Sequence, residues 1–331
     1  MLTVLLSAPY MIPEVKRFEP VFAYFGLEVI QPAVNERLSE EELLAYAGQF
    51  DAAICGDDRF TERVLQACAG RLKVISKWGT GIDSIDRQAA ARLGIQVRNT
   101  PNAFTLPVAD TTLGYILLFV RQLLWMDEQM KQGRWEKAQT RSLAECTLGV
   151  IGVGNVGKAV LRRGRAFGMR LMGNDIIDIA PDFLREVEVK MLPLEELLQQ
   201  ADFVSLHCDL NPSSYHLINK ITLSLMKPTA VLINTARGPI IDEPALIEAL
   251  RTQQIAGAAL DVFESEPLPH DSPLLGMSNV FLAPHNANAS PMAWERVHWN
   301  TIRNALEGLG LPTQPLESLR EQYGKTFQLT A

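Results

Sequence analysis

A glycine-rich turn carries the clearest chemical pattern in the sequence. It lies between an apolar run and a helical pattern, and its residues are Gly152, Gly154, Asn155, Val156 and Gly157. In a G-x-G-x-x-G turn, Gly152 permits a sharp reversal, Gly154 lets the backbone approach a pyrophosphate, and Gly157 lets the helix pack closely on the strand. The first N–H groups of that helix favour a bound anion. The spacing therefore predicts a dinucleotide site.

An acid at the end of the next predicted strand indicates which dinucleotide the turn binds. Asp175 follows the apolar segment 170–173, about 20 residues beyond the glycines. A carboxylate there accepts hydrogen bonds from both ribose hydroxyls and repels a 2′-phosphate, so NAD is favoured over NADP. Glycines alone often mark turns, but here a strand, a helix and an acid accompany them.

Three polar residues further along the chain have side chains suited to acid–base chemistry. Arg237 follows an apolar run, and Gly238 beside it is expected to leave room for a ligand. A guanidinium binds a carboxylate through two parallel N–H···O bonds. Glu266 and His285 follow two later predicted strands, where the carboxylate can fix the tautomer of the imidazole and leave its other nitrogen to exchange a proton. The alternatives are a surface arginine and a structural histidine.

The elements that position these residues alternate between strands and helices along the whole chain. This alternation predicts parallel sheets with helices on both faces. We expect an α/β protein of two Rossmann-like, doubly wound parallel-sheet domains with a cleft between them. The assigned ranges are 1–103 plus 288–331 for a flavodoxin-like substrate domain, and 104–287 for an NAD-binding domain. Ligands of such sheets gather at the carboxyl ends of the strands.

Two further segments have distinct patterns. An uninterrupted helical pattern over 108–131 is apolar on more than one side. Such a helix either joins two domains and packs on a partner subunit or belongs to the core of one domain. Trp135 follows it and is expected to be an interface anchor. The tail after Pro312 is predicted to be extended.

Composition narrows the class of protein. The 331 residues carry a net charge of −7 with a pI near 5.4, which argues against nucleic-acid binding. Four scattered cysteines favour reduced thiols in a cytoplasmic protein and no metal site. The sequence predicts neither a signal peptide nor a membrane span, so we expect no membrane partner.

Seven motifs span nearly the whole chain: GTGID (79–83), VAD (108–110), GVGNVG (152–157), VSLHCDLNP (204–212), LINTARG (232–238), LDVFESEP (260–267) and APH (283–285). Together they resemble the NAD-dependent D-isomer-specific 2-hydroxyacid dehydrogenases of the phosphoglycerate dehydrogenase type. The resemblance implies an oxidoreductase that transfers a hydride between NAD(H) and a 2-hydroxy or 2-keto acid. It also implies a homodimer or a tetramer of dimers.

The resemblance assigns roles to single residues. Arg237 would orient the substrate, Glu266 would support His285, and His285 would be the general acid and base. Backbone groups of Gly79, Thr80 and Gly81 would bind the substrate carboxylate. The residues expected along the cofactor are His207, Thr235, Ala236 and Asp261.

Some residues depart from the family pattern and leave the substrate open. The stretch after His285 reads NAN. Where an Arg-Ser pair often stands for phosphoglycerate, this chain has Cys55-Gly56-Asp57-Asp58-Arg59, and the two aspartates would repel a phosphate. Arg59 and Lys77 could compensate, although they are expected to be ordinary solvated charges. Phosphoglycerate, glyoxylate or hydroxypyruvate, and larger 2-keto acids all remain candidates. A second function is an NAD-sensing regulator of the corepressor kind, since the same fold and the same three residues occur there.

Overall fold

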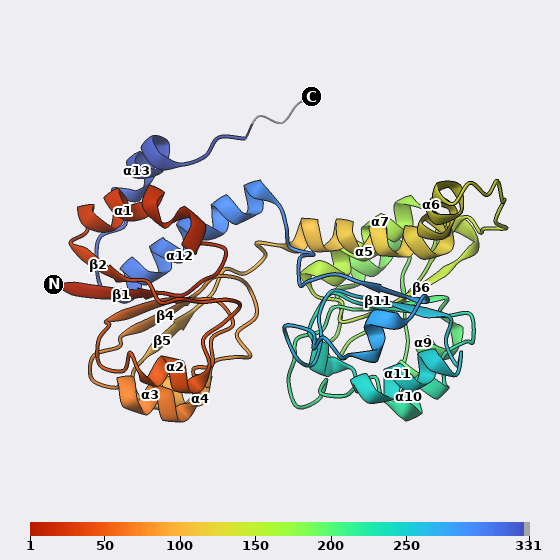
Figure 1. Cartoon of the computed structure of the whole chain (residues 1–331), viewed down its shortest axis with the longest axis horizontal. Helices are drawn as coiled ribbons and strands as arrows, with labels where there is room; N and C mark the ends of the chain where they lie inside the picture. Colours follow the sequence, from red (N-terminus) through yellow and green to blue (C-terminus); the bar gives the residue numbers. More distant parts are fainter. Residues whose placement is uncertain (328–331) are drawn as a thin grey trace. The chain divides into compact units, whose positions relative to one another are not determined.

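The computed structural model describes residues 1–327, which form two compact units. Unit 1 contains Met1–Phe104 and the chain from Ser290 onward, and unit 2 contains Thr105–Ala289 (Figure 1). Within the range 288–331 that the sequence assigns to the first domain, residues 328–331 lie outside the described part.

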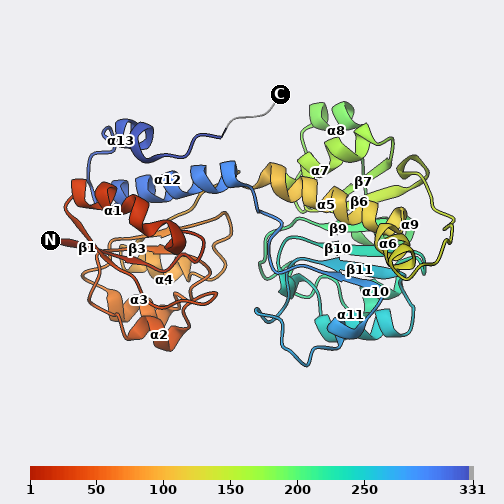
Figure 2. The ribbon, with the colours of Figure 1, turned by 45° about the horizontal axis from the view of Figure 1, so that its top comes forward.

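Unit 1 is built on a five-stranded parallel sheet with the strand order β2-β1-β3-β4-β5. Its strands are β1 (Leu2–Leu6), β2 (Leu27–Ile30), β3 (Ala52–Cys55), β4 (Val74–Lys77) and β5 (Gln96–Arg98). Helices cover both faces, as Figure 2 shows. One face carries α1 (Val15–Tyr24) and α12 (Pro291–Gly308), and the other carries α2 (Glu40–Leu44), α3 (Glu62–Cys68) and α4 (Arg87–Arg92).

Alternation along the strands of unit 1 explains the two helical layers. Leu5, Ala53 and Ile75 pack with α2, α3 and α4 in one buried cluster. Neighbouring strand residues point to the other face, where α12 approaches so closely that a Cβ on Gly308 would lie 2.4 Å from Val74 Cβ. Side chains two residues apart on a strand share a face, so each strand serves both layers.

The C-terminal tail contains a helix that the sequence did not predict. α13 covers Leu316–Tyr323, whereas the pattern after Pro312 predicts extended chain. Leu316 and Leu319 are both buried, and their spacing places them on one helical face. The prediction of an extended tail was wrong because this two-residue apolar face is too short to stand out.

Unit 2 contains a seven-stranded parallel sheet with the order β12-β11-β10-β9-β6-β7-β8. Its strands are β6 (Thr147–Ile151), β7 (Arg170–Asn174), β8 (Lys190–Met191), β9 (Phe203–Leu206), β10 (Val231–Asn234), β11 (Gly257–Leu260) and β12 (Val280–Leu282). All of the neighbouring pairs are parallel. The predicted α/β class with two parallel sheets is therefore confirmed.

Two helical layers also cover the sheet of unit 2. One contains α5 (Thr105–Val120), α7 (Asn155–Ala166) and α8 (Pro181–Val187). The other contains α9 (Leu194–Gln200), α10 (Lys220–Ser224) and α11 (Glu243–Arg251). Val231 and Ile233 face the first layer, and Leu232 between them faces the second.

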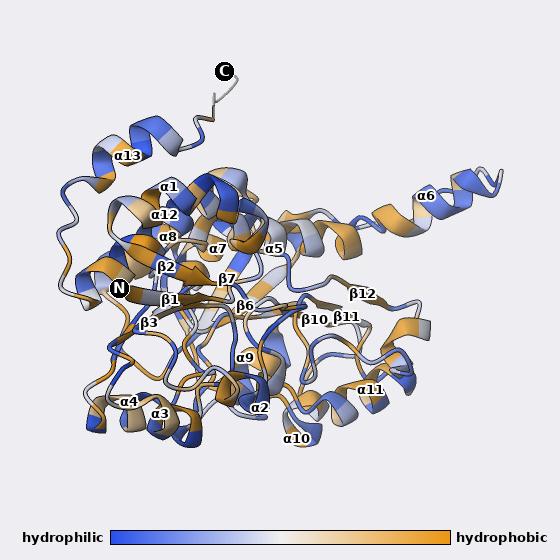
Figure 3. Ribbon diagram, turned by 60° about the vertical axis from the view of Figure 1, so that its left-hand side comes forward, coloured by the Kyte–Doolittle hydropathy of each residue, from blue (hydrophilic) through white to orange (hydrophobic). Residues whose placement is uncertain are grey.

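The predicted helix over 108–131 is interrupted. The structure has α5 and a separate α6 (Leu123–Lys131), and Gln122 between them has a left-handed φ of 49°. α5 buries Leu113 and Ile116 in unit 2, whereas α6 extends away from the rest of that unit (Figure 3). Neither glycine nor proline marks the break, so the apolar pattern could not locate it.

Candidate active site

Three neighbouring strands of unit 2 bring the predicted catalytic residues to one edge of the sheet. β10, β11 and β12 are adjacent and parallel, so their carboxyl ends meet at that edge. Arg237 follows β10, Glu266 follows β11 and His285 follows β12. Parallel pairing therefore gathers residues that are widely separated in the sequence.

Glu266 and His285 form a hydrogen-bonded pair. Glu266 Oε2 lies 2.9 Å from His285 Nδ1, and Glu266 Oε1 accepts the backbone N–H of Phe263 at 3.0 Å. Both carboxylate oxygens are therefore held, and an ionised carboxylate favours the tautomer in which Nδ1 carries the hydrogen. The side chains of His285 and Glu266 retain 22% and 18% exposure. Nε2 is then the ring atom that can exchange a proton with a ligand.

Asp261 fixes the turn that carries His285. Its carboxylate accepts the backbone N–H groups of Asn286 at 3.0 Å and Ala287 at 2.9 Å, and its carbonyl accepts that of His285 at 2.7 Å. Tyr115 donates its hydroxyl to Asp261 Oδ1, and burial raises the pKa of that hydroxyl. The sequence indicated a place along the cofactor for Asp261, and the geometry adds a positional role that the sequence did not indicate.

The segment after Arg237 packs directly on the loop that carries Glu266. A Cβ on Gly238 would lie 1.9 Å from the carbonyl carbon and oxygen of Phe263. The expectation that Gly238 leaves room for a ligand was therefore wrong, because backbone of the same unit fills that space. Arg237 Nη1 donates to the Ala236 carbonyl at 2.9 Å, and the Arg237 side chain remains partly exposed.

The three glycines of the dinucleotide turn have different surroundings. Gly152 has a φ of 89°, and a Cβ there would lie 2.4 Å from the backbone nitrogen of Cys208. A Cβ on Gly157 would lie 2.0 Å from the Gly152 carbonyl oxygen. A Cβ on Gly154, the N-cap of α7, would meet no heavy atom within 4 Å. Glycine at 152 and 157 is thus required by the fold, whereas glycine at 154 keeps space open where a pyrophosphate would approach.

Asp175 is tied to the glycine turn. Its Oδ2 accepts the Val153 N–H at 2.6 Å, and its Oδ1 accepts that of Ile177 at 3.1 Å. Ile176 and Ile177 are 82% and 65% exposed, which is unusual for isoleucine. They form an apolar surface beside the acid that sequence reasoning missed, although two isoleucines directly after Asp175 were a visible signal. Together these residues fit the adenosine half of NAD.

The other residues expected along the cofactor follow strands of the same sheet. His207 follows β9, its Nε2 lies 2.8 Å from Ser205 Oγ, and burial lowers the pKa of its ring to about 3. His207 is therefore neutral. Thr235 Oγ1 lies 3.2 Å from Thr112 Oγ1, and Ala236 N–H donates to Asn234 Oδ1 at 3.0 Å.

The carboxylate-binding loop predicted at Gly79–Gly81 lies after β4 in unit 1. Gly79 has a φ of 128°, and its N–H donates to Thr100 Oγ1 at 3.2 Å. The hydroxyl of Thr80 donates to the Thr100 carbonyl at 3.1 Å. Because the Gly79 N–H already has an acceptor, the N–H groups of Thr80 and Gly81 are the donors suited to an added anion.

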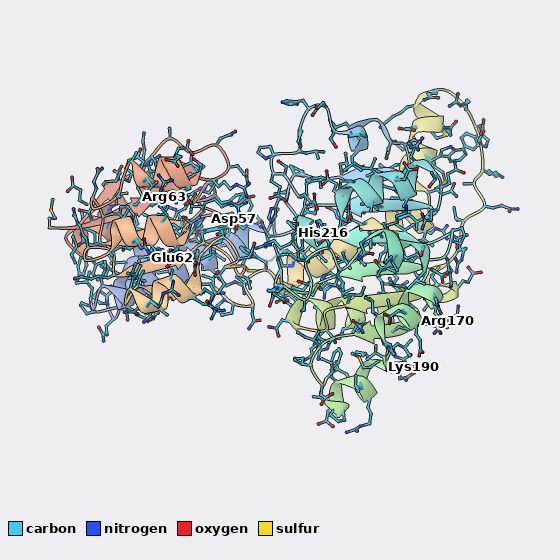
Figure 4. The ribbon with its side chains drawn as sticks, turned by 90° about the horizontal axis from the view of Figure 1, so that it is seen from below. Asp57, Glu62, Arg63, Arg170, Lys190 and His216 are labelled. Carbon is cyan, nitrogen blue, oxygen red and sulfur yellow. The ribbon has the colours of Figure 1, made fainter. Side chains whose placement is uncertain are left out.

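Lys77 beside this loop is not a solvated charge, so that expectation was wrong. Its side chain is 4% exposed, and Nζ lies 3.1 Å from Asp57 Oδ1 (Asp57 is labelled in Figure 4). Asp58 is buried, and burial raises the pKa of its carboxyl to about 6. Arg59 is exposed, as the sequence predicts. The cation nearest the loop is therefore already paired with a carboxylate.

Residues 1–327 contain no group of three metal-ligating side chains placed to hold an ion. Within the same range no helix combines the length and apolar character needed to cross a membrane.

A family model matches most of unit 2. Residues 113–287 match the model described as D-isomer specific 2-hydroxyacid dehydrogenase, NAD binding domain. This range includes the glycine turn, Asp175 and the three residues at the ends of β10, β11 and β12.

Individual proteins are similar over most of the chain. A glyoxylate reductase of Thermococcus onnurineus (strain NA1) is 36% identical over 86% of this chain and 86% of its own. A D-3-phosphoglycerate dehydrogenase of Homo sapiens is 39% identical over 82% of this chain, which spans only 50% of that relative. The crystal structure of D-lactate dehydrogenase from Aquifex aeolicus, complexed with NAD and lactic acid, has a TM-score of 0.82 at 28% identity, covering 93% and 97% of the two chains.

Proposed function

The chain belongs to the D-isomer-specific 2-hydroxyacid dehydrogenase family, and from that premise we propose that Arg237, Glu266 and His285 bind and protonate a 2-keto acid. The protein is an NAD-dependent oxidoreductase that acts on CH–OH groups. The observation that carries the proposal is the hydrogen bond between Glu266 Oε2 and His285 Nδ1.

The proton step follows from this pair. In reduction, the protonated His285 donates from Nε2 to the C2 oxygen of the keto acid, and it keeps the Nδ1 hydrogen that faces Glu266. The neutral ring then accepts a proton at Nε2 in the reverse direction. When bound, NADH supplies the hydride that adds to C2. Glu266 keeps one ring orientation and one tautomer through both directions.

The proposed substrate-binding groups are Arg237 and the loop Gly79–Gly81 after β4. Arg237 presents a planar fork that suits a carboxylate and its neighbouring carbonyl, and its charge stabilises the oxygen as negative charge develops on it. The N–H groups of Thr80 and Gly81 are the proposed donors to the substrate carboxylate. Gly152, Gly154, Asn155, Val156, Gly157 and Asp175 would hold the cofactor on unit 2.

We infer that the substrate is a 2-keto acid without a phosphate group. The pairing of Lys77 with Asp57 leaves little net positive charge beside the carboxylate loop, and Gly56 has no side chain to add any. Glyoxylate and hydroxypyruvate fit this arrangement better than a phosphorylated acid.

The proposal is tested by mixing protein and NADH with a panel of 2-keto acids and following absorbance at 340 nm. The panel contains glyoxylate, hydroxypyruvate, pyruvate and 3-phosphohydroxypyruvate. We expect the kcat/KM for hydroxypyruvate to exceed that for its phosphorylated analogue by at least roughly tenfold, a difference of about 1.4 kcal/mol. The reverse order contradicts the substrate proposal. NADH binding without oxidation by any acid contradicts the enzymatic proposal and favours an NAD-sensing regulator.

We further propose that the protein forms a homodimer through α6 and the segment after it. Leu124, Met130 and Trp135 are 48%, 53% and 80% exposed, and several large apolar side chains exposed on one short segment usually mark an interface. Light scattering at micromolar concentration should give twice the mass of one chain for the wild type. The double variant Leu124→Glu/Met130→Glu should give the mass of a single chain. A monomeric wild-type protein contradicts this proposal.

The described cysteines are all free, and we propose the cytoplasm as the location.

A further inference from the structure

A second histidine–glutamate pair joins the loop that carries Glu266 to the segment before α10. His216 Nε2 lies 2.5 Å from Glu264 Oε1, and both side chains are about one-third exposed, at 32% and 30%. His216 is labelled in Figure 4. It has a left-handed φ of 49°, which is uncommon for a residue with a side chain and indicates a backbone held by its surroundings.

The backbone around His216 is bonded to the segment that follows Arg237. His216 N–H donates to the Pro239 carbonyl at 2.9 Å, and Ile218 N–H donates to that of Ile240 at 3.0 Å. The Ile218 carbonyl in turn accepts the N–H of Asp242 at 2.8 Å. Residues 216–218 therefore run alongside residues 239–242.

The same segment contacts the loop of Glu266 from a second direction. A Cβ on Gly238 would lie 2.5 Å from the backbone nitrogen of Glu264, so the two backbones are in direct contact. Glu264 N–H donates to Glu243 Oε2 at 3.2 Å. Glu264 is thus held by its side chain to His216 and by its backbone to the start of α11.

From Glu264 the connection to the proposed acid–base group is short. Phe263 is the neighbour of Glu264, and its N–H donates to Glu266 Oε1, while Glu266 Oε2 meets His285 Nδ1. A displacement of residues 263–264 would move the donor that orients the Glu266 carboxylate. Shifts of about 1 Å at such a carboxylate can cost up to about 100-fold in rate.

We propose that His216 is a positioning residue, which holds the loop of Glu264 against the Arg237 segment and thereby aims Glu266 at His285. The inference rests on the roles of Glu266 and His285 given above. His216 touches neither substrate nor cofactor in this scheme, and its influence passes through Glu264, Phe263 and Glu266.

The first test measures kcat and KM for His216→Ala, His216→Gln and Glu264→Ala. We expect kcat of His216→Ala to fall roughly tenfold while its KM for the keto acid changes by less than about threefold. Gln carries a donor at a similar reach, so His216→Gln should recover most of the activity. The matched control is Arg162→Ala, which removes the pair of Arg162 with Glu186 in the same unit and should leave kcat unchanged.

A second measurement needs neither substrate nor NADH. The chain has only five histidines, so ¹⁵N-histidine labelling gives a spectrum in which the Nδ1 resonance of His285 is identified by its loss in His285→Gln. In the wild type this nitrogen should be protonated. In His216→Ala it should move toward a mixture of tautomers. If that variant does not fold, Glu264→Ala decides by the same resonance.

The outcomes separate this inference from the proposed function. A folded His216→Ala with wild-type kcat and an unchanged His285 resonance overturns the positioning role. In the Glu266→Gln background, His216→Ala should have no further effect on kcat, and an additional tenfold loss would also overturn it. If His285→Gln itself stays active, the proposed function fails, whereas the tautomer measurement still decides whether His216 positions the pair.

Discussion

Glu266 Oε2 and His285 Nδ1 lie 2.9 Å apart although the two residues are separated by 19 positions in the chain. The other oxygen of Glu266 is held by the Phe263 N–H, and the turn of His285 is held by Asp261. These hydrogen bonds hold the Glu266 carboxylate and the turn of His285 in place, so the pair is preorganised before any substrate binds.

The first prediction concerns the proton-transfer group. His285→Gln keeps a polar side chain but cannot exchange a proton near neutral pH, so kcat should fall by at least ~100-fold. Steady-state rates at 340 nm measure this loss, and titration of NADH fluorescence serves as the control for cofactor binding. Turnover within a few-fold of the wild type would remove His285 from the mechanism.

Arg237→Lys tests the carboxylate fork. Lysine keeps the charge but loses the planar, bidentate geometry, so KM should rise by roughly tenfold or more, with a smaller change in kcat. The wild-type and variant proteins are compared over a full range of keto-acid concentrations. Unchanged KM and kcat would show that Arg237 does not contact the substrate.

Two glycine substitutions distinguish a glycine required for stability from one required for cofactor binding. A side chain at Gly152 would collide with the backbone at Cys208, so Gly152→Ala should lower the thermal unfolding temperature by several degrees. Gly154→Ala meets no atom of the protein, so it should leave that temperature nearly unchanged and raise the Kd for NADH roughly tenfold. Calorimetry and fluorescence titration measure the two quantities. Wild-type NADH affinity in Gly154→Ala would place the pyrophosphate elsewhere.

The buried His298 makes the stability of unit 1 depend on pH. Burial lowers the pKa of its ring to about 4 from 6.5, and Nδ1 accepts the Trp78 N–H at 2.9 Å. The unfolded chain takes up a proton near pH 6.5, but the folded protein resists it until about pH 4. The free energy of unfolding should therefore be intact above pH 6.5 and fall by about 2 kcal/mol by pH 5 from this group.

Urea unfolding followed by tryptophan fluorescence checks this prediction between pH 7.5 and 5. His298→Gln does not titrate, so its stability should decline less steeply over that range. The partly buried His207 in unit 2 adds a separate decline in both proteins, because desolvation also lowers the pKa of its ring. Parallel pH curves for the wild type and His298→Gln would refute the assignment.

Much of this protein could be predicted from the sequence because the signals were local. The alternation of strands and helices and the glycine spacing each depend on neighbouring residues. Parallel pairing then implies that residues after β10, β11 and β12 meet at one edge. Arg237, Glu266 and His285 could therefore be proposed together from the sequence.

Only the tertiary structure decided which atoms meet. The pairing of Lys77 with Asp57, the packing of Gly238 on Phe263 and the bond between His216 and Glu264 each join residues from different segments of the chain. The path of a loop depends on the backbone packed against it, and no periodicity in the sequence encodes that path. For the same reason the break at Gln122 and the anchoring role of Asp261 were visible only in three dimensions.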